Sequence, residues 1–343
     1  MVNKSPAALF LLIKSLAGVN DFTSEEETNL KSLAERRLRM AYNLTPMWER
    51  YVVTSEERKL CSYKVSGLVD SSIYYEVDGG YYKLGSNSAG TETYYIQAKH
   101  DYGNPPIVLY KTATDKRWVF VKSTSLTVDD DGVVSITSNP PAITQKAKAD
   151  GTYTDYSSPA KVKQWTIVDG NISGFPVIDE VSLVQYDETY FFSSLTLSGK
   201  TAKDTIQDFI RIHSNNAFMK NSATEYDFYV ADDGANVINA GNESSVFVTY
   251  KKPLVFPNPS GSSNDLLLPF NSQYEQIPLE FFNYTAHGTY ADFLRMDGQH
   301  DKAAFEEQKA DMFLATELER IDIINNNNSL NHKFSTYVNR STR

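Results

Sequence analysis

The chain has almost no cysteine. Cys61 is the single cysteine among 343 residues, so no disulfide can form within the chain. This usage is typical of synthesis in a reducing compartment such as a cytoplasm. Long apolar runs are also lacking, because no stretch approaches the roughly 18 apolar residues that a membrane-spanning helix needs. The sequence therefore excludes a disulfide scaffold and predicts no membrane partner.

The chain has fewer basic than acidic residues. Lys and Arg number 33 against 43 Asp and Glu, which gives a formal net charge of −10 and a sequence pI of about 5.1. A protein that wraps the phosphate backbone of a nucleic acid needs a basic surface. The balance argues against stable nucleic-acid binding by the chain as a whole.

Motifs for cofactors, metals and nucleophiles are missing. The five histidines form no His-Glu-x-x-His pair, and neither a glycine-rich phosphate loop nor a Gly-x-Ser-x-Gly elbow occurs. The segment VDDDG (128–132) lacks the alternating acids and distal Glu of a calcium loop, which favours a hairpin turn. We expect no cofactor, no metal and no enzyme, although a hydrolase built from two dispersed carboxylates stays open.

Both ends of the chain carry helical patterns. The apolar run Ala7–Ile13 is followed by Lys14 and predicts an amphipathic first helix rather than a secretory leader. Ser24 and Glu27 are spaced as a capping box, and a second helix is expected to run to about Tyr42.

The middle of the chain, from 63 to 248, predicts antiparallel β structure. Short runs rich in Tyr, Val, Phe and Thr alternate with five Asp-Gly dipeptides, which suit tight hairpin turns. A polar stretch near 138–160 predicts a linker between two β units. A short helix is expected within 201–218, with Ile206, Phe209 and Ile210 on one face.

Two apolar stripes at helical spacing occupy the C-terminal third and are joined by a short polar turn at Asp297-Gly298. They predict an antiparallel αα-hairpin. The residues expected to pack along it are Leu279, Phe282, Ala286, Tyr290, Phe293, Ala303, Ala310, Leu314, Leu318 and Ile321.

The acid-rich segment 297–321 raises the possibility of a site. His300 and Asp301 are neighbours in the predicted turn, and we expect Glu306 and Glu307 on the helix face opposite Ala310 and Leu314. We therefore interpret these acids as the solvated face of a packing helix.

Together these patterns predict an α+β protein. Its helical core would combine the N-terminal helices with the C-terminal αα-hairpin, and antiparallel β-sandwich or barrel-like insertions would lie between them in the chain. The expected parts are N-terminal helices at 1–60, β units at 61–140 and 141–250, the αα-hairpin at 251–324, and a polar C-terminal tail at 325–343.

Aromatic residues in the β region allow a second interpretation. Trp118 and Trp165, with Tyr81, Tyr82, Tyr94 and Tyr95, could present ring faces to sugars, whereas the alternation of core and surface positions accounts for the same pattern. Trp118 and Trp165 are the candidate glycan contacts.

The order of these parts resembles the head-to-tail adaptors of tailed bacteriophages, also called connector or head-completion proteins, and in particular tail tubular protein A. The resemblance covers about 60 N-terminal residues and 246–343. It is carried by VFVTYKKP with its Tyr250–Pro253 exit, then LLLPFNSQYEQIPLEFFNYTAHGTYADFL, then DGQHDKAAFEEQKADMFLATELERI. The β region is larger than such an adaptor needs.

The resemblance implies a structural protein of the virion neck, assembled in the host cytoplasm. It would form a ring, usually of twelve subunits, between the portal protein and the tail tube or nozzle protein, and would line the channel through which DNA is ejected. The residues that could dock on the portal are those of the basic tail, His332, Lys333, Phe334, Tyr337, Arg340 and Arg343. A frayed terminus is the alternative interpretation of this tail. The alternative is a carbohydrate-binding β-sandwich collar or fibre component of a virion.

Overall fold

The computed structural model describes residues 5–341, except 71–76, 91, 99–106, 113–115, 123–125, 129–133, 137–144, 150–156, 170–171, 194–195, 215–223, 242 and 255–276. The chain forms two compact units. A helical unit combines Met1–Val52 with Pro253–Arg343, and a β unit is formed by Val53–Lys252.

Within its described residues the helical unit contains four helices, and local sequence accounts for several of their ends. They are α1 (Pro6–Ala17), α2 (Ser24–Asn43), α3 (Leu279–Met296) and α4 (His300–Ser341). Ser5 caps α1 by accepting a hydrogen bond from the amide of Ala8 at 3.2 Å. Gly18 closes α1 with a φ of 68°, a left-handed conformation that glycine adopts without steric cost.

The capping box of α2 lies one residue earlier than the sequence analysis predicted. Thr23, and not Ser24, is the N-cap. Its hydroxyl accepts from the amide of Glu26 at 3.3 Å, and the Glu26 carboxylate accepts from the amide of Thr23 at 2.7 Å. The run TSEEE offers two overlapping Ser/Thr-x-x-Glu patterns, so spacing could not choose between them.

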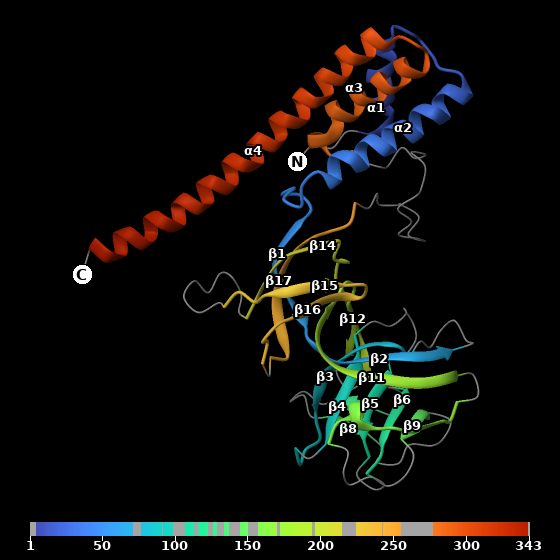
Figure 1. Ribbon diagram of the computed structural model, residues 1–343, viewed down its shortest axis with the longest axis vertical. Coiled ribbons are helices and arrows are strands. Elements are labelled where there is room, and N and C mark those ends of the chain that lie inside the picture. The colour runs from blue at the N-terminus through green and yellow to red at the C-terminus, as the bar shows by residue number, and fades with distance from the viewer. Residues whose placement is uncertain are drawn as a thin grey trace. The chain divides into compact units, whose positions relative to one another are not determined.

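One hydrophobic core joins the two ends of the chain. α3 packs against α1, α2 and α4, and Figure 1 shows the four helices lying together. Trp48 meets Phe281 edge-on, with ring centroids 4.7 Å apart. The buried members of this core are Leu9, Ile13, Leu30, Ala34, Leu38, Ala41, Tyr42, Trp48, Leu254, Ile277, Phe281, Phe282, Tyr284, Ala286, Ala310, Leu314 and Ile321.

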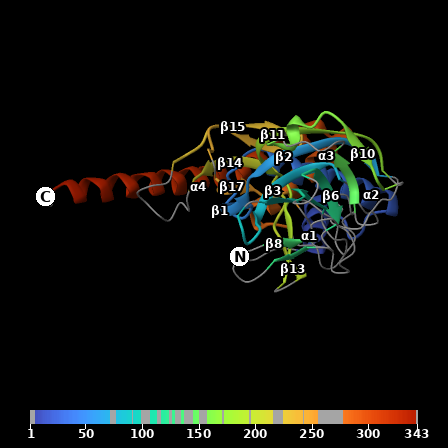
Figure 2. The same cartoon turned by 90° about the horizontal axis from the view of Figure 1, so that it is seen from below.

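Helix α4 is much longer than the helix it pairs with. It has 42 residues and α3 has 18, which at 1.5 Å per residue makes α4 roughly 60 Å long. Its C-terminal end runs clear of α1, α2 and α3 in both views (Figures 1 and 2). The segment 325–343 was expected to be a separate polar tail, but the backbone is helical as far as Ser341.

The β unit contains four sheets within its described residues. Ten strands form the largest, in the order β10-β9-β6-β5-β4-β3-β2-β11-β16-β15, and the others are β1-β17-β14, β12-β13 and β7-β8. The strands are β1 (Val52–Lys59), β2 (Cys61–Asp70), β3 (Gly79–Ser86), β4 (Thr93–Gln97), β5 (Ile107–Lys111), β6 (Trp118–Lys122), β7 (Leu126–Val128), β8 (Val134–Ile136), β9 (Gln145–Ala149), β10 (Trp165–Ile167), β11 (Ile172–Gln185), β12 (Thr189–Ser193), β13 (Thr196–Ala202), β14 (Asp208–His213), β15 (Phe228–Ala231), β16 (Gly234–Val237) and β17 (Ser245–Lys251).

The large sheet curls so strongly that β10, at one edge, also contacts β11. The eight strands from β10 to β11 therefore enclose a barrel-like interior. Trp118 and Phe120 of β6 lie in one buried cluster, while Val119 and Val121 lie in another. This alternation is the two-residue period of a strand buried on both faces.

The α+β class, the N-terminal helices, the C-terminal helix pair and the large antiparallel sheets are as predicted. The turn between β15 and β16 consists of Asp232 and Asp233, and Gly234 of the Asp-Gly dipeptide begins β16. Antiparallel strands β7 and β8 flank VDDDG, although 129–133 themselves lie outside the described residues.

Two expectations for the β region are wrong. Strands before and after residue 140 belong to one sheet, so 61–140 and 141–250 are not separate units. In place of the short helix expected within 201–218, the described residues continue β13 to Ala202 and then form β14, which pairs with β17. Pairing with β17 outweighs the weak helical spacing of Ile206, Phe209 and Ile210.

Candidate functional site

The interface between α3 and α4, here called the seam of the αα-hairpin, contains most of the residues that the sequence assigned to it. Ala286, Ala303 and Ala310 are fully buried, and their small side chains allow the two helices to approach closely. Phe282, Leu314 and Ile321 are also buried, while Tyr290, Phe293 and Leu318 are partly buried against the same core.

One residue of the predicted stripe is misplaced. Leu279 is 47% exposed, and Phe281 occupies the core instead, at 1% exposure. The predicted stripe began at Leu279, at the very start of the helix. The buried face of α3 is wider than that stripe and includes Phe281, which directly precedes Phe282. The bulk of Phe281 and its contacts with Trp48 and Tyr51 decide the orientation.

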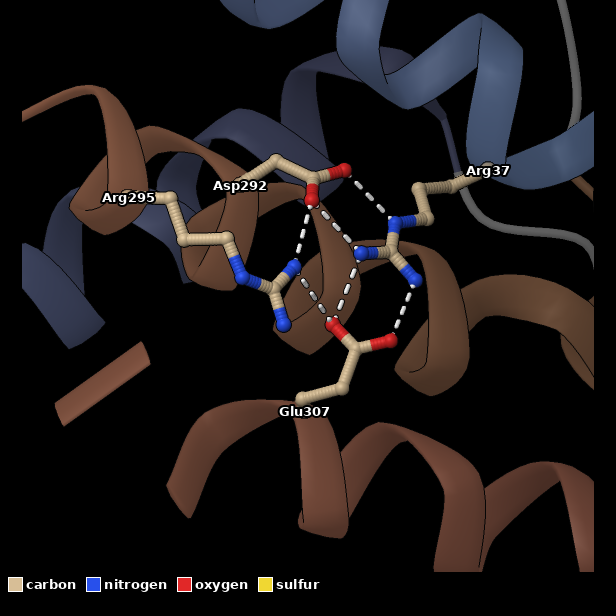
Figure 3. A network of polar contacts seen from close by, with 4 residues as sticks. All are labelled: Arg37, Asp292, Arg295 and Glu307. Atoms are coloured by element: carbon tan, nitrogen blue, oxygen red, sulfur yellow. Dashed lines mark hydrogen bonds and ion pairs between the residues drawn. The ribbon is translucent and has the colours of Figure 1, made fainter. Parts of the chain in front are cut away.

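A charged network centred on the buried Arg37 connects three helices of this unit (Figure 3). Arg37 of α2 donates two hydrogen bonds to Asp292 of α3, at 2.7 and 2.6 Å, and two to Glu307 of α4, both at 2.7 Å. Arg295 of α3 bridges the same two carboxylates at 2.9 and 3.2 Å. The guanidinium of Arg37 therefore makes paired contacts with carboxylates from both helices of the hairpin.

Electrostatics hold this network in its ionised form. Burial opposes the charge on Arg37, but the hydrogen bonds to Asp292 and Glu307 outweigh burial and raise its pKa. Burial would raise the pKa of Asp292, but the hydrogen bonds from Arg37 and Arg295 hold that pKa below its ordinary value. Two cations and two anions balance, so the network carries no spare charge for a ligand.

Glycine makes room for the central guanidinium. A Cβ on Gly288 of α3 would lie 3.0 Å from Cδ and 3.2 Å from Nε of Arg37. These distances are tighter than ordinary van der Waals contact, and Arg37 is fixed on its other side by two carboxylates. Glycine at this position lets α2 and α3 enclose the arginine.

Glu306 and Glu307 do not form the solvated face expected from the sequence. Glu307 is one anchor of Arg37, and Glu306 is buried, at 8% exposure. Glu306 lies 2.6 Å from Nδ1 of His287 and 2.8 Å from Nζ of Lys309. Burial would raise the pKa of Glu306, yet Lys309 and His287 lower it. The expectation of a solvated face was wrong, because Glu306 and Glu307 precede Ala310 by four and three residues and therefore share its face of α4. On that face they meet His287 of α3 and Arg37 of α2.

The β unit holds a second buried charged cluster. Arg58 of β1 is fully buried, and its Nη2 lies 2.8 Å from Glu56 and donates to the hydroxyl of Tyr250 at 2.7 Å. Glu188 accepts from the amide of Lys59 at 3.0 Å, while its other oxygen is 3.9 Å from Nη1 of Arg58. Burial raises the pKa of Glu188 to about 7, although Lys203 and Arg58 partly offset this.

The candidate glycan contacts do not present their rings to solvent. Trp118 and Trp165 are each 6% exposed and pack among the residues inside the barrel. Trp165 lies against Phe120, with ring centroids 5.1 Å apart. Both indoles are core residues, which was the other interpretation of the pattern.

The residues of the predicted docking tail fall on the last turns of α4. The backbone at His332, Lys333, Phe334, Tyr337 and Arg340 is helical, but the side chains beyond Ile323 lie outside the described part of the structure, as does Arg343.

Within the described residues, no three His, Cys, Asp or Glu side chains gather closely enough to hold a metal ion. No helix in this part of the chain is long and apolar enough to cross a membrane. Comparisons with protein-family models, with curated protein sequences and with solved structures find no match.

Proposed function

We propose that the protein is a structural component of a virion, a head-to-tail adaptor that forms a ring between the portal and the tail. The architecture of the helical unit is the observation that supports this proposal. Four helices from the two ends of the chain share one core, and α4 continues far beyond the other three. This order of parts matches what the resemblance in the sequence implies.

The helical unit has features that a ring subunit needs. Subunits of a closed ring meet through two different faces, related by rotation about the ring axis. The network around Arg37 holds α2, α3 and α4 at fixed positions, so that both faces are set by one rigid body. The net charge of −10 would limit adhesion of DNA to a channel through the ring.

The last turns of α4 are the proposed contact with the portal. Lys333 and Arg340 lie there, and no acidic residue follows Asp322. A helix that leaves its own bundle offers surface to a partner without disturbing the core.

The experiment mixes the purified chain with purified portal rings and examines the product by negative-stain electron microscopy. We expect closed rings of this chain stacked coaxially on the portal. Monomers that leave the portal bare would contradict the adaptor assignment. A chain shortened to residue 328 should form rings that no longer bind the portal, and undiminished binding would contradict the role of the tail.

A control separates a loss of charge from a loss of helix. Lys333→Glu with Arg340→Glu keeps the length of α4 and reverses its terminal charge. We expect this variant to behave like the shortened chain at physiological ionic strength, and Lys302→Glu, at the opposite end of α4, to bind the portal normally.

A further inference from the structure

An open groove of about 830 Å³ lies in the β unit, beside the barrel. Its walls come from β2, β3, β4 and β11 on one side and from β15, β16 and the connection to β17 on the other. The volume falls within the range of small-molecule sites. Neither charged cluster described above lines it.

Strand irregularities converge on this groove. The pairing of β2 with β3 shifts between Cys61 and Tyr63, and the pairing of β11 with β2 shifts between Glu180 and Leu183. The pairing of β3 with β4 shifts next to Lys83. Bulges interrupt the regular alternation of a strand and redirect its side chains, and they are frequent beside binding sites. All three lie at residues that line the groove.

Three tyrosines line the groove. Tyr63 and Tyr95 meet edge-on, with ring centroids 4.8 Å apart, and Tyr95 remains partly exposed. Tyr229, on the opposite wall, is 58% exposed. An exposed ring face with a polar rim is a suitable surface for the C–H face of a sugar ring.

Polar groups surround these rings. Glu180, Glu243, Asn236 and Lys83 line the groove together with the serines 62, 182 and 244. Carboxylates, an amide, an ammonium group and hydroxyls supply both donors and acceptors, as a ligand with many hydroxyl groups requires. The lining has one cation and two anions, so it disfavours phosphates and other anions, and its many polar groups disfavour an apolar ligand.

We propose that this groove binds a neutral saccharide. The ring of Tyr229 would stack on one sugar, while Glu180, Glu243 and Asn236 would pair with its hydroxyls. The inference is independent of the adaptor assignment, because it concerns a different unit of the chain and a different ligand.

The test applies the full-length chain to an array of neutral, acidic and basic oligosaccharides of two to six sugars and measures the strongest neutral hit by isothermal titration calorimetry. We expect Tyr229→Ala to raise the Kd by about ten-fold or more, and Glu180→Gln with Glu243→Gln to weaken binding further. Val230→Ala is the matched control, since Val230 is the next residue of β15, is 57% exposed and does not line the groove.

An array without a neutral hit, or a hit whose Kd is the same in Tyr229→Ala and in the wild type, would overturn the proposal. A second arm titrates a lysine-rich peptide in low and high salt. Salt-sensitive peptide binding without any saccharide hit, lost in Glu180→Gln with Glu243→Gln, would overturn the proposal and assign the acidic groups to a cationic protein partner. Circular dichroism of each variant verifies that the β unit is folded. Loss of ring formation on the portal would not affect any of these outcomes.

Discussion

At the scale of single residues, two buried arginines differ in how well they are compensated. Arg37 pairs with two carboxylates, each through two hydrogen bonds. Arg58 donates through Nη2, whereas its Nε and Nη1 find no hydrogen-bond partner among the described residues. A buried charge that loses one of its partners is costly, because the remaining charge stays out of water. Replacing a partner of Arg37 and replacing a partner of Arg58 should therefore change the free energy of unfolding by different amounts.

Replacing Asp292 with Asn should destabilise the helical unit by about 2–3 kcal/mol, since Arg37 keeps its charge but loses a paired acceptor. Urea denaturation followed by circular dichroism at 222 nm measures this. Glu35→Gln is the control, because Glu35 pairs with Arg39 on the exposed face of α2. It should cost less than about 0.5 kcal/mol. Equal losses in both variants would mean that the network adds no more than a surface ion pair.

The pKa of Glu188, raised by burial from 4.5 to about 7, makes the β unit sensitive to pH. A folded-state pKa above the unfolded value means that the folded chain holds the proton more tightly. The contribution of Glu188 to the free energy of unfolding is then complete below about pH 4.5. It is lost as the pH rises through 7, by up to about 3 kcal/mol. Glu188→Gln cannot ionise and should flatten this dependence.

Urea denaturation at pH 5, 6, 7 and 8, followed by the near-ultraviolet circular dichroism of the aromatic-rich β unit, measures the dependence. Asp179→Asn is the control, since Asp179 is exposed on β11. A Glu188→Gln variant with the slope of the wild type would show that another group is titrating.

At the scale of elements, the αα-hairpin combines an apolar seam with the charged network. Ala286, Ala303 and Ala310 bring the helices together, and Asp292 and Glu307 extend from the same two helices to hold α2. Close packing and charge pairing therefore depend on each other, because the carboxylates reach Arg37 only when the seam is closed.

A charge in the seam should unfold the hairpin. Leu314→Lys places an ammonium group at a position that is 8% exposed, and the expected cost is more than about 3 kcal/mol. His300→Ala, at the exposed start of α4, should change the stability by less than about 0.5 kcal/mol. Thermal unfolding at 222 nm compares the two, and a stable Leu314→Lys variant would mean that this part of α4 contributes little to the core.

Helices and strands could be predicted from the sequence where the apolar residues repeat at a regular spacing. The prediction failed where the burial or pairing of a residue depends on partners distant in the chain. The stripe from Phe282 to Ile321 was recoverable because each helix repeats it. The spacing of Glu306 and Glu307 to Ala310 already puts both acids on the packed face of α4, but their partners, His287 and Arg37 in other helices, could not be read from the sequence. A signal for Arg37 was available as well, because it lies between Ala34 and Leu38 on the apolar face of α2, whereas Arg36 and Arg39 are exposed.

The β region follows the same rule. Alternation and Asp-Gly turns predicted antiparallel strands, but they contain no information on which strands share a sheet. Residue 140 therefore resembled a boundary, whereas β9 pairs with β6 across it. Nor does alternation distinguish an exposed tyrosine such as Tyr229 from a buried one such as Tyr81.

At the scale of the whole molecule, one unit is continuous in sequence and the other is divided. The β unit, Val53–Lys252, contains its own core clusters. The helical unit needs Leu30 and Leu38 from one end of the chain and Phe281 and Ala310 from the other. The two should therefore differ in whether they fold as isolated fragments.

A fragment of residues 53–252 should fold alone, with cooperative unfolding and the near-ultraviolet spectrum of buried tryptophans. A fragment of residues 253–343 should bind hydrophobic dyes and unfold without cooperativity until residues 1–52 are added as a peptide. Differential scanning calorimetry and dye fluorescence measure both. A cooperative transition in 253–343 by itself would contradict the shared core.

The divided helical unit imposes an order on synthesis. α1 and α2 leave the ribosome first, and α3 follows only after the whole of Val53–Lys252 has been made. At about 5–20 residues per second, that interval lasts on the order of ten seconds or more. During it, the apolar faces around Leu30 and Leu38 have no α3 to cover them. Newly made chains are then most open to chaperones, and to premature association with one another.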